Sequence, residues 1–251
     1  VIRNPAYTKE CQERERKIKI KAQEIKEKNT TYKLKTYAGP GSKDFTDLIP
    51  DNVTSIIFTD EIKPDNTDIL DVDDDGDGGV VAWIEDNGKT MKVSTQKKGQ
   101  KVEADSCSYL FAEKENIESI DLTMLDTKDA TEMDGMFEGC ENLKTIDLAP
   151  LNTDNVENMS SMFEKCKSLT ALDISCLNTS KVTDMTMMFS GCEGLKSLDV
   201  SNFDTSKVED MMGMFSFCES ISELDLSSFD TSNVTDMNEL VGYCSALKNI
   251  N

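Results

Sequence analysis

The chain has 251 residues and is strongly acidic, with 48 Asp and Glu, 27 Lys and Arg, a formal net charge of −21 and no histidine. The negative charge argues against nucleic acid or an anionic membrane as a partner, because their phosphates would be repelled. The missing histidine excludes Ser-His-Asp and Cys-His nucleophile pairs and His-ligated metal centres. A carboxylate-pair glycosidase is compatible with the composition, but no motif supports one, so we expect no enzyme activity.

The amino-terminal segment is rich in charged, helix-forming residues. Residues 8–29 contain no Gly or Pro, which favours a helix after Pro5. Apolar residues are sparse in it, a pattern that fits either a solvated helix or a weak self-association element. We therefore expect residues 1–30 to form a charged helix or stalk.

Three later segments are typical of β-strands because they are rich in β-branched and aromatic residues. They are residues 53–58, 80–84 and 90–95. Asn87-Gly88, between the last two, permits the positive φ angles of a tight hairpin turn. Residues 31–108 are thus expected to be a linker and a small β cap, in which Trp83 covers the open end of the repeats that follow.

An acidic segment in this region resembles the first half of a calcium-binding EF-hand loop. The pattern places carboxylates at alternate positions, at Asp71, Asp73, Asp75 and Asp77, with a glycine at position 76 for the bend. The twelfth position is Ala82, where the loop needs a bidentate Glu. Two interpretations remain open: a weak calcium site at these four aspartates, or an acidic turn without an ion. No other cofactor is expected.

One motif recurs every 26 residues through the second half of the chain. Met133-x-x-Met136-Phe137-x-x-Cys140 returns with its cysteine at 166, 192 and 218, and a degraded copy ends at Cys244. Fixed spacing in this range is typical of repeat architectures. Residues 109–251 are expected to hold about five such repeats, and a further copy beginning at Leu247 indicates a truncated carboxyl end.

Each repeat combines two periodicities. In residues 143–148, Ile146 and Leu148 alternate with polar residues, as in a half-buried strand. Residues 159, 162, 163 and 166 follow helical spacing, and Asn158 is placed to cap that helix. The predicted fold class is α/β: a leucine-rich-repeat-like solenoid with a parallel β-sheet and short helices, a small amino-terminal β cap and a preceding single helix.

Five of the eight cysteines occupy one repeat position and would form a column. We interpret them as buried thiols that act as small hydrophobic side chains. Disulfides and a soft-metal site are the alternatives.

The outward positions of the predicted strands are the candidate partner-binding residues. They are Thr145, Asp147, Ala171, Asp173, Ser197, Asp199, Glu223 and Asp225. The aspartates recur in register, so their repulsion must be offset either by amide groups of the following turn or by a cation or basic partner. A column of threonines, from Thr127 to Thr231, is expected to be structural.

The repeats resemble those of BspA-like leucine-rich-repeat surface proteins of bacteria, whose copies look like LxxLDLSxFDTSxVTDMxxMFxxC. Residues 221–237 (ISELDLSSFDTSNVTDM) are similar to this pattern except at Ile221, and Leu240-Val241 then stand in place of Met-Phe. The resemblance covers roughly residues 45–251. It implies a non-catalytic protein at the cell surface or secreted, which binds a protein or glycan in adhesion. The alternative is a structural subunit of a surface filament, with the amino-terminal helix as the assembly element.

Overall fold

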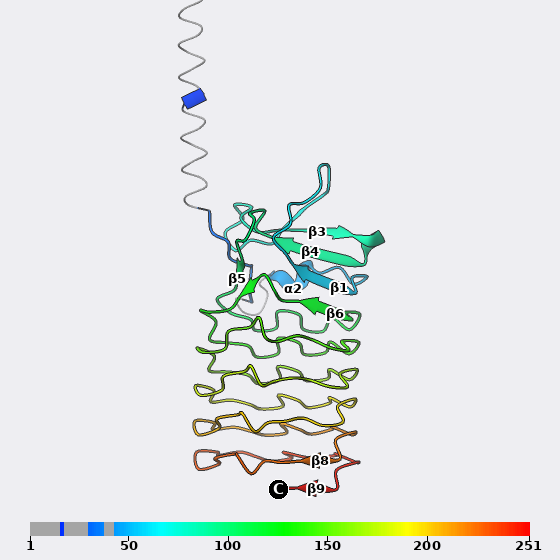
Figure 1. Cartoon of the computed structure of the whole chain (residues 1–251), viewed down its shortest axis with the longest axis vertical. Helices are drawn as coiled ribbons and strands as arrows, with labels where there is room; N and C mark the ends of the chain where they lie inside the picture. The colour runs from blue at the N-terminus through cyan, green and yellow to red at the C-terminus, as the bar shows by residue number, and fades with distance from the viewer. Residues whose placement is uncertain (1–15, 18–29, 38–42) are drawn as a thin grey trace, which may run out of the picture.

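The computed structural model describes residues 16–17, 30–37 and 43–251. A β-sheet lies at one end, and the repeats follow as layers stacked along the long axis, with the carboxyl terminus in the last layer (Figure 1). The predicted helix of residues 8–29 lies outside the described residues except for Arg16 and Lys17. Within the described part, no helix has the length and apolar character needed to cross a membrane.

The sheet at the end of the stack has five strands in the order β2-β3-β4-β1-β6. β1 pairs in parallel with β4 and β6, whereas β3 is antiparallel to β2 and β4. The strands are β1 (Ser55–Phe58), β2 (Leu70–Asp71), β3 (Val81–Glu85), β4 (Thr90–Ser94) and β6 (Ser119–Asp121). The three strands predicted from the sequence are therefore confirmed as β1, β3 and β4.

Local chemistry explains the turns that bound these strands. Between β3 and β4 the short 3-10 segment η1 (Asp86–Gly88) has φ of 54° at Asn87 and 90° at Gly88, as the Asn-Gly pair predicted. The helix α2 (Phe45–Leu48) begins where Asp44 accepts the backbone N–H of Thr46 at 2.9 Å. It buries Phe45 beside Phe58 and Phe111, which joins the sheet to the first repeat.

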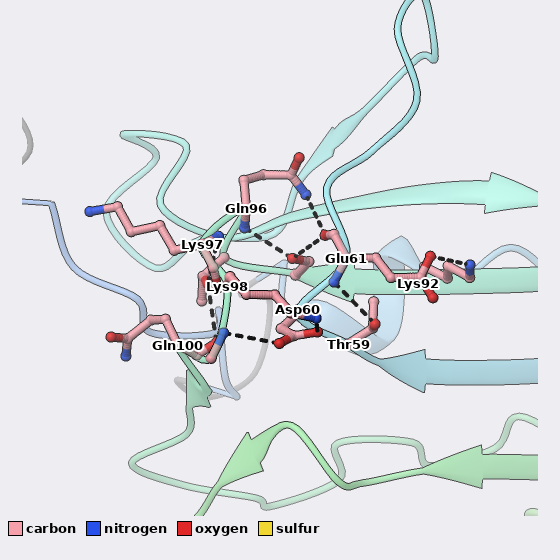
Figure 2. A network of polar contacts seen from close by, with 11 residues as sticks. Thr59, Asp60, Glu61, Lys92, Gln96, Lys97, Lys98 and Gln100 are labelled. Atoms are coloured by element: carbon pink, nitrogen blue, oxygen red, sulfur yellow. Dashed lines mark hydrogen bonds and ion pairs between the residues drawn. The ribbon is translucent and has the colours of Figure 1, made fainter.

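A network of polar contacts joins the segment after β1 to the segment after β4 (Figure 2). The Glu61 carboxylate accepts from Lys92 at 2.7 Å, and the Glu61 carbonyl accepts the Ser94 hydroxyl at 2.8 Å. Asp60 accepts from Lys98 at 2.8 Å and from the Gly99 amide at 3.0 Å. These contacts fix the carboxyl-terminal ends of β1 and β4, where the long 60–69 segment begins.

Trp83 is buried, but it does not cover the end of the repeats. Its indole donates to Glu85 at 2.8 Å, and its side chain lies outside the main hydrophobic cluster. The strands β4 and β1 lie between β3 and β6 in the sheet, so β1 is the strand that joins the first layer. The prediction that Trp83 covers the open end of the repeats was therefore wrong, because two strands separate β3 from the first layer.

Backbone hydrogen bonds join each repeat to the next at constant register. Isolated parallel bridges link five residues spaced by 26, namely Glu132, Asn158, Asp184, Asp210 and Asp236. Two short parallel pairs add to them: β5 (Val102–Glu103) with β7 (Leu125–Asp126), and β8 (Glu223–Leu224) with β9 (Asn249–Ile250). Successive layers are therefore neighbours through main-chain contacts.

The predicted α/β solenoid with short helices is wrong. Residues 105–251, all of which are described, contain no helix and only the short strands β6 to β9 in place of a continuous parallel sheet. Between residues 43 and 251 the helical elements are α2 and η1, and Arg16 and Lys17 are the other helical residues that the structure describes. The leucine-rich-repeat-like class is corrected to small mixed and parallel sheets joined by turns.

Backbone conformation explains why the Met-x-x-Met-Phe-x-x-Cys segments are turns. In every copy the third and seventh residues have positive φ, for example 57° at Gly135, 69° at Gly139, 54° at Ser161 and 58° at Lys165. A residue at positive φ interrupts a right-handed helix and instead suits the third position of a type II turn. The Met136 amide donates to the Met133 carbonyl at 3.3 Å, whereas the next amide, of Phe137, donates to Met162 of the following layer at 2.9 Å.

The core is a set of side-chain columns that run through the layers. Phe111, Phe137, Phe163, Phe189 and Phe215 stack with ring centroids 5.3–5.7 Å apart and planes within 15° of parallel. The methionines and cysteines of the first four motif copies are fully buried around them. The sequence thus predicted correctly which residues point inward, but it predicted helices where the backbone forms turns.

Candidate functional site

The cysteine column is interior structure. In five layers the thiol donates to the carbonyl of the phenylalanine 29 residues earlier, with Sγ to O distances of 3.0–3.2 Å. All five cysteines are free, and burial raises the pKa of Cys140 and Cys218 to about 12. Four of the five, Cys140, Cys166, Cys192 and Cys218, are buried, which confirms their interpretation as buried thiols, whereas Cys244 in the last layer is half-buried. Each of the five thiols bonds to the preceding layer.

The threonine column also connects layers. The Thr127 hydroxyl donates to the carbonyl of Asn152 and accepts its amide, both at 2.9 Å. Thr153, Thr179 and Thr205 repeat this double contact one layer further on, and all four are buried. The expected structural role of these four threonines is confirmed.

The aspartate column is exposed and turned toward its own backbone. Asp147, Asp173, Asp199 and Asp225 each accept the amide two residues later at 3.0 Å, and Asp121 does so at 2.9 Å. The Ser175 hydroxyl, and then the Ser175 amide, lowers the pKa of Asp173. Serines 201 and 227 act in the same way on the pKa of Asp199 and Asp225. The turn amides that were one of the two expected offsets are thus present.

The eight candidate partner-binding residues are all exposed and take equivalent places in four successive layers. We call this set, namely Thr145, Asp147, Ala171, Asp173, Ser197, Asp199, Glu223 and Asp225, the outward face. Its aspartates are the same in every layer, whereas the other four residues differ in size and charge. The side chain of Glu223 accepts from Asn249 of the next layer at 3.2 Å.

A surface cavity of about 540 Å³ lies over the turns of the second to fifth motif copies. Lys165, Met187, Gly191, Met212, Phe217 and Glu239 contribute to its lining. Sequence reasoning missed it because these residues fall at variable positions of the motif, and the predicted helices would have placed them elsewhere. The sequence signal is Gly191 and Gly213, which line the cavity and, with Gly135 and Gly139, stand at positive-φ positions of the motif.

The acidic loop between β2 and β3 brings together three of the four predicted calcium ligands. One carboxylate oxygen from each of Asp73, Asp75 and Asp77 lies within 4.8 Å of the other two. Asp71 lies outside this group and accepts the Asp73 amide at 3.1 Å. Ala82, at the twelfth position, lies within β3 and cannot supply a ligand from its side chain.

Asp73 is the unusual member of this group. Its side chain is 1% exposed, and its Oδ2 accepts the amides of Asp77 and Gly79 at 3.2 and 3.1 Å. Among the described residues, its buried Oδ1 accepts no hydrogen bond. Burial, together with the facing carboxylates of Asp75 and Asp77, raises the pKa of Asp73 to about 7.

A family model described as "Mycoplasma protein of unknown function, DUF285" matches the chain twice, over residues 105–197 and 169–251. Together the matches span residues 105–251, which is more than half of the chain and contains every repeat. No curated protein and no solved structure matches the chain significantly.

Proposed function

This chain belongs to the DUF285 family, and from that premise we propose that it is a non-catalytic binding protein of the bacterial surface or secreted space. The outward face would meet a protein or glycan partner. The similarity of the repeats to BspA-like surface proteins supports the proposed location and an adhesive role. Sequence composition supports the absence of catalysis, since no histidine is available as a general base.

The observation that carries the proposal is the contrast between inward and outward positions within the four layers of the outward face. The inward Met, Phe and Cys positions are identical in the first four motif copies, whereas the outward residues 145, 171, 197 and 223 are Thr, Ala, Ser and Glu. Packing constrains the inward residues, because a change of even one methylene in a dense core is felt. Nothing comparable constrains Thr145, Ala171 and Ser197, which leaves them free to fit a partner.

Charge indicates the chemistry of that partner. Four aspartates recur along the outward face, and the whole chain carries a net charge of −21. A basic protein surface, or an uncharged glycan that accepts and donates hydrogen bonds, suits this face better than a polyanion.

The test uses a glycan array and a panel of immobilised basic and acidic proteins, probed with the full chain. A triple variant, Thr145→Arg, Ala171→Arg and Ser197→Arg, should lose binding to any hit while its melting temperature is unchanged. The control, Glu157→Arg with Glu209→Arg, lies at exposed positions away from the outward face. It adds at least as much positive charge, so a general electrostatic effect would appear there as well. Unchanged binding by the triple variant would exclude the outward face as the binding site.

A further inference from the structure

We propose that Asp73, Asp75 and Asp77 form a calcium site that fastens residues 31–35 to the β2–β3 connection. The proposal concerns a different part of the molecule from the outward face and does not depend on its function. The proposed site also differs from an EF-hand loop. Asp71 is not a ligand, and no residue takes the place of the glutamate that an EF-hand has at its twelfth position, which is Ala82 here.

The first argument for a bound cation is that the negative charge of these three carboxylates is not compensated. Three carboxylates converge, and among the described residues none of the ion pairs includes any of them. The buried Asp73 Oδ1 has no donor, and an unpaired oxygen inside a protein carries the full cost of its lost hydration. A bound cation would supply the missing partner for this oxygen and reduce the repulsion between the three groups.

The second step is the size and hardness of that cation. Ligand oxygens lie about 2.3–2.6 Å from calcium, so two oxygens on opposite sides of the ion are about 4.6–5.2 Å apart. The three carboxylate oxygens all lie within 4.8 Å of one another, so a single ion of this size can contact all three. Three carboxylates without sulfur or imidazole favour a hard ion. Magnesium requires a tighter octahedral shell and gives up its water reluctantly, so calcium is the better fit.

The third step is the rigidity of the loop. The backbone of residues 33–35 binds it on both sides of Asp73, since the Lys35 amide donates to Val72 at 2.9 Å and the Asp74 amide donates to Lys33 at 3.0 Å. The Thr31 hydroxyl donates to the Asp75 carboxylate at 3.0 Å. A Cβ added to Gly79 would lie 1.9 Å from the Thr31 carbonyl oxygen, so the two chains meet too closely for any side chain there. The carboxylates are therefore held in place before an ion arrives, which lowers the entropic cost of binding.

The experiment titrates the full chain with calcium chloride by calorimetry and measures its melting temperature, with sodium chloride at matched ionic strength as the reference. That reference is needed because any salt screens a chain of charge −21. We expect saturable binding of one calcium ion, with a dissociation constant of about 10⁻⁴–10⁻³ M, a higher melting temperature than in sodium chloride and a smaller response to magnesium chloride.

Three single variants locate the site. Asp73→Asn and Asp75→Asn should each weaken calcium binding by about tenfold or more, since ligand charge sets calcium affinity. Asp74→Asn removes the same charge from the same exposed loop without touching the cluster and should bind as the parent does. Asp75 is exposed, so its variant remains informative if Asp73→Asn does not fold.

Any of three results would overturn the proposal. The first is the absence of saturable calcium binding at millimolar calcium. The second is an equal loss in Asp74→Asn and Asp75→Asn, which would show diffuse screening. The third is a magnesium response as large as the calcium response, which would reject calcium as the occupant.

Discussion

At the scale of single residues, the buried thiols link stability to alkaline pH. Burial raises the pKa of Cys140 from an ordinary value of 9.0 to about 12. Below pH 9 the thiol is protonated in both the folded and the unfolded chain, so it adds no pH dependence. Between about pH 9 and pH 12 only the unfolded chain releases the proton, and the folded state loses stability as pH rises.

We therefore expect the free energy of unfolding to fall above pH 9 and the Cys140→Ala variant to lack one contribution to that fall. Alanine forfeits the bond to the Phe111 carbonyl and leaves a small void, at a cost of about 1–2 kcal/mol at pH 8. One such thiol contributes up to about 1.4 kcal/mol per pH unit, so the advantage of the parent should shrink by about 1 kcal/mol at pH 10. Urea unfolding of both proteins at the two pH values measures this. A difference that stays constant with pH would contradict it.

At the scale of elements, the double turn of each repeat depends on two residues at positive φ. Gly191 has φ of 72°, and an added Cβ there would meet only ordinary contacts with Lys165 at 3.4 Å. Gly191→Ala therefore isolates the conformational cost, and we expect a loss of about 1–2 kcal/mol in the free energy of unfolding. Glu239 has φ of 56° and is exposed at the third position of the last copy.

The complementary substitution, Glu239→Gly, should therefore leave stability unchanged or raise it slightly, because glycine adopts this conformation without steric cost. Urea unfolding of both variants against the parent gives the comparison. Equal destabilisation by the two substitutions would show that positive φ is not what the turn requires.

These turns also show how far the sequence could be interpreted. The spacing of Met159, Met162, Phe163 and Cys166 predicted the buried residues correctly, because a double turn and a two-turn helix place the same four side chains inside. The spacing alone could not distinguish the two backbones, since Ser161 and Lys165 give no sign of positive φ in this copy; the sign lies in the glycines at the equivalent positions 135, 139, 191 and 213. The β-strands near Trp83 were predictable because alternation and the Asn-Gly turn are local signals.

The candidate sites, too, were partly predictable from the sequence and partly not. Exposure of the outward face followed from its alternation with buried leucines, and the sequence spacing of the aspartates brought Asp73, Asp75 and Asp77 together. The contact of Thr31 with Asp75 joins residues 44 apart, and the bridge of Leu34 with Asp73 joins residues 39 apart. No local sequence pattern predicts contacts between residues so far apart. The contacts that residues 31–35 make with the acidic loop could therefore be found only from the folded structure.

At the scale of the whole molecule, each layer depends chiefly on its two neighbours. Removing residues 159–184 deletes one complete repeat and places Met185 directly after Asn158. The Phe137 amide would then meet the Met188 carbonyl in place of that of Met162, and Phe137 would stack on Phe189. We expect this variant to fold, with a smaller urea m-value and a lower melting temperature, because less surface is buried.

Removal of residues 159–171 is the control for this deletion. It takes out half a repeat and shifts every later residue out of register, so the columns of Phe, Cys and Thr cannot form. Circular dichroism and urea unfolding of the two deletion variants should therefore differ sharply. A whole-repeat deletion that behaves like the half-repeat deletion would contradict the neighbour-dependent stability of the layers.

The direction of the bonds between layers has a mechanical consequence. The amides of Met133, Gly135 and Phe137 donate to carbonyls of the following layer. The layers follow one another along the long axis of the molecule (Figure 1), so these bonds join neighbours along the stack. Tension applied between the two ends of the stack would act parallel to these hydrogen bonds. The bonds between one pair of layers would then break before those of the next pair, instead of all resisting together in shear. Each rupture would release a coil of 26 residues, so under load the molecule would extend in equal steps at low force.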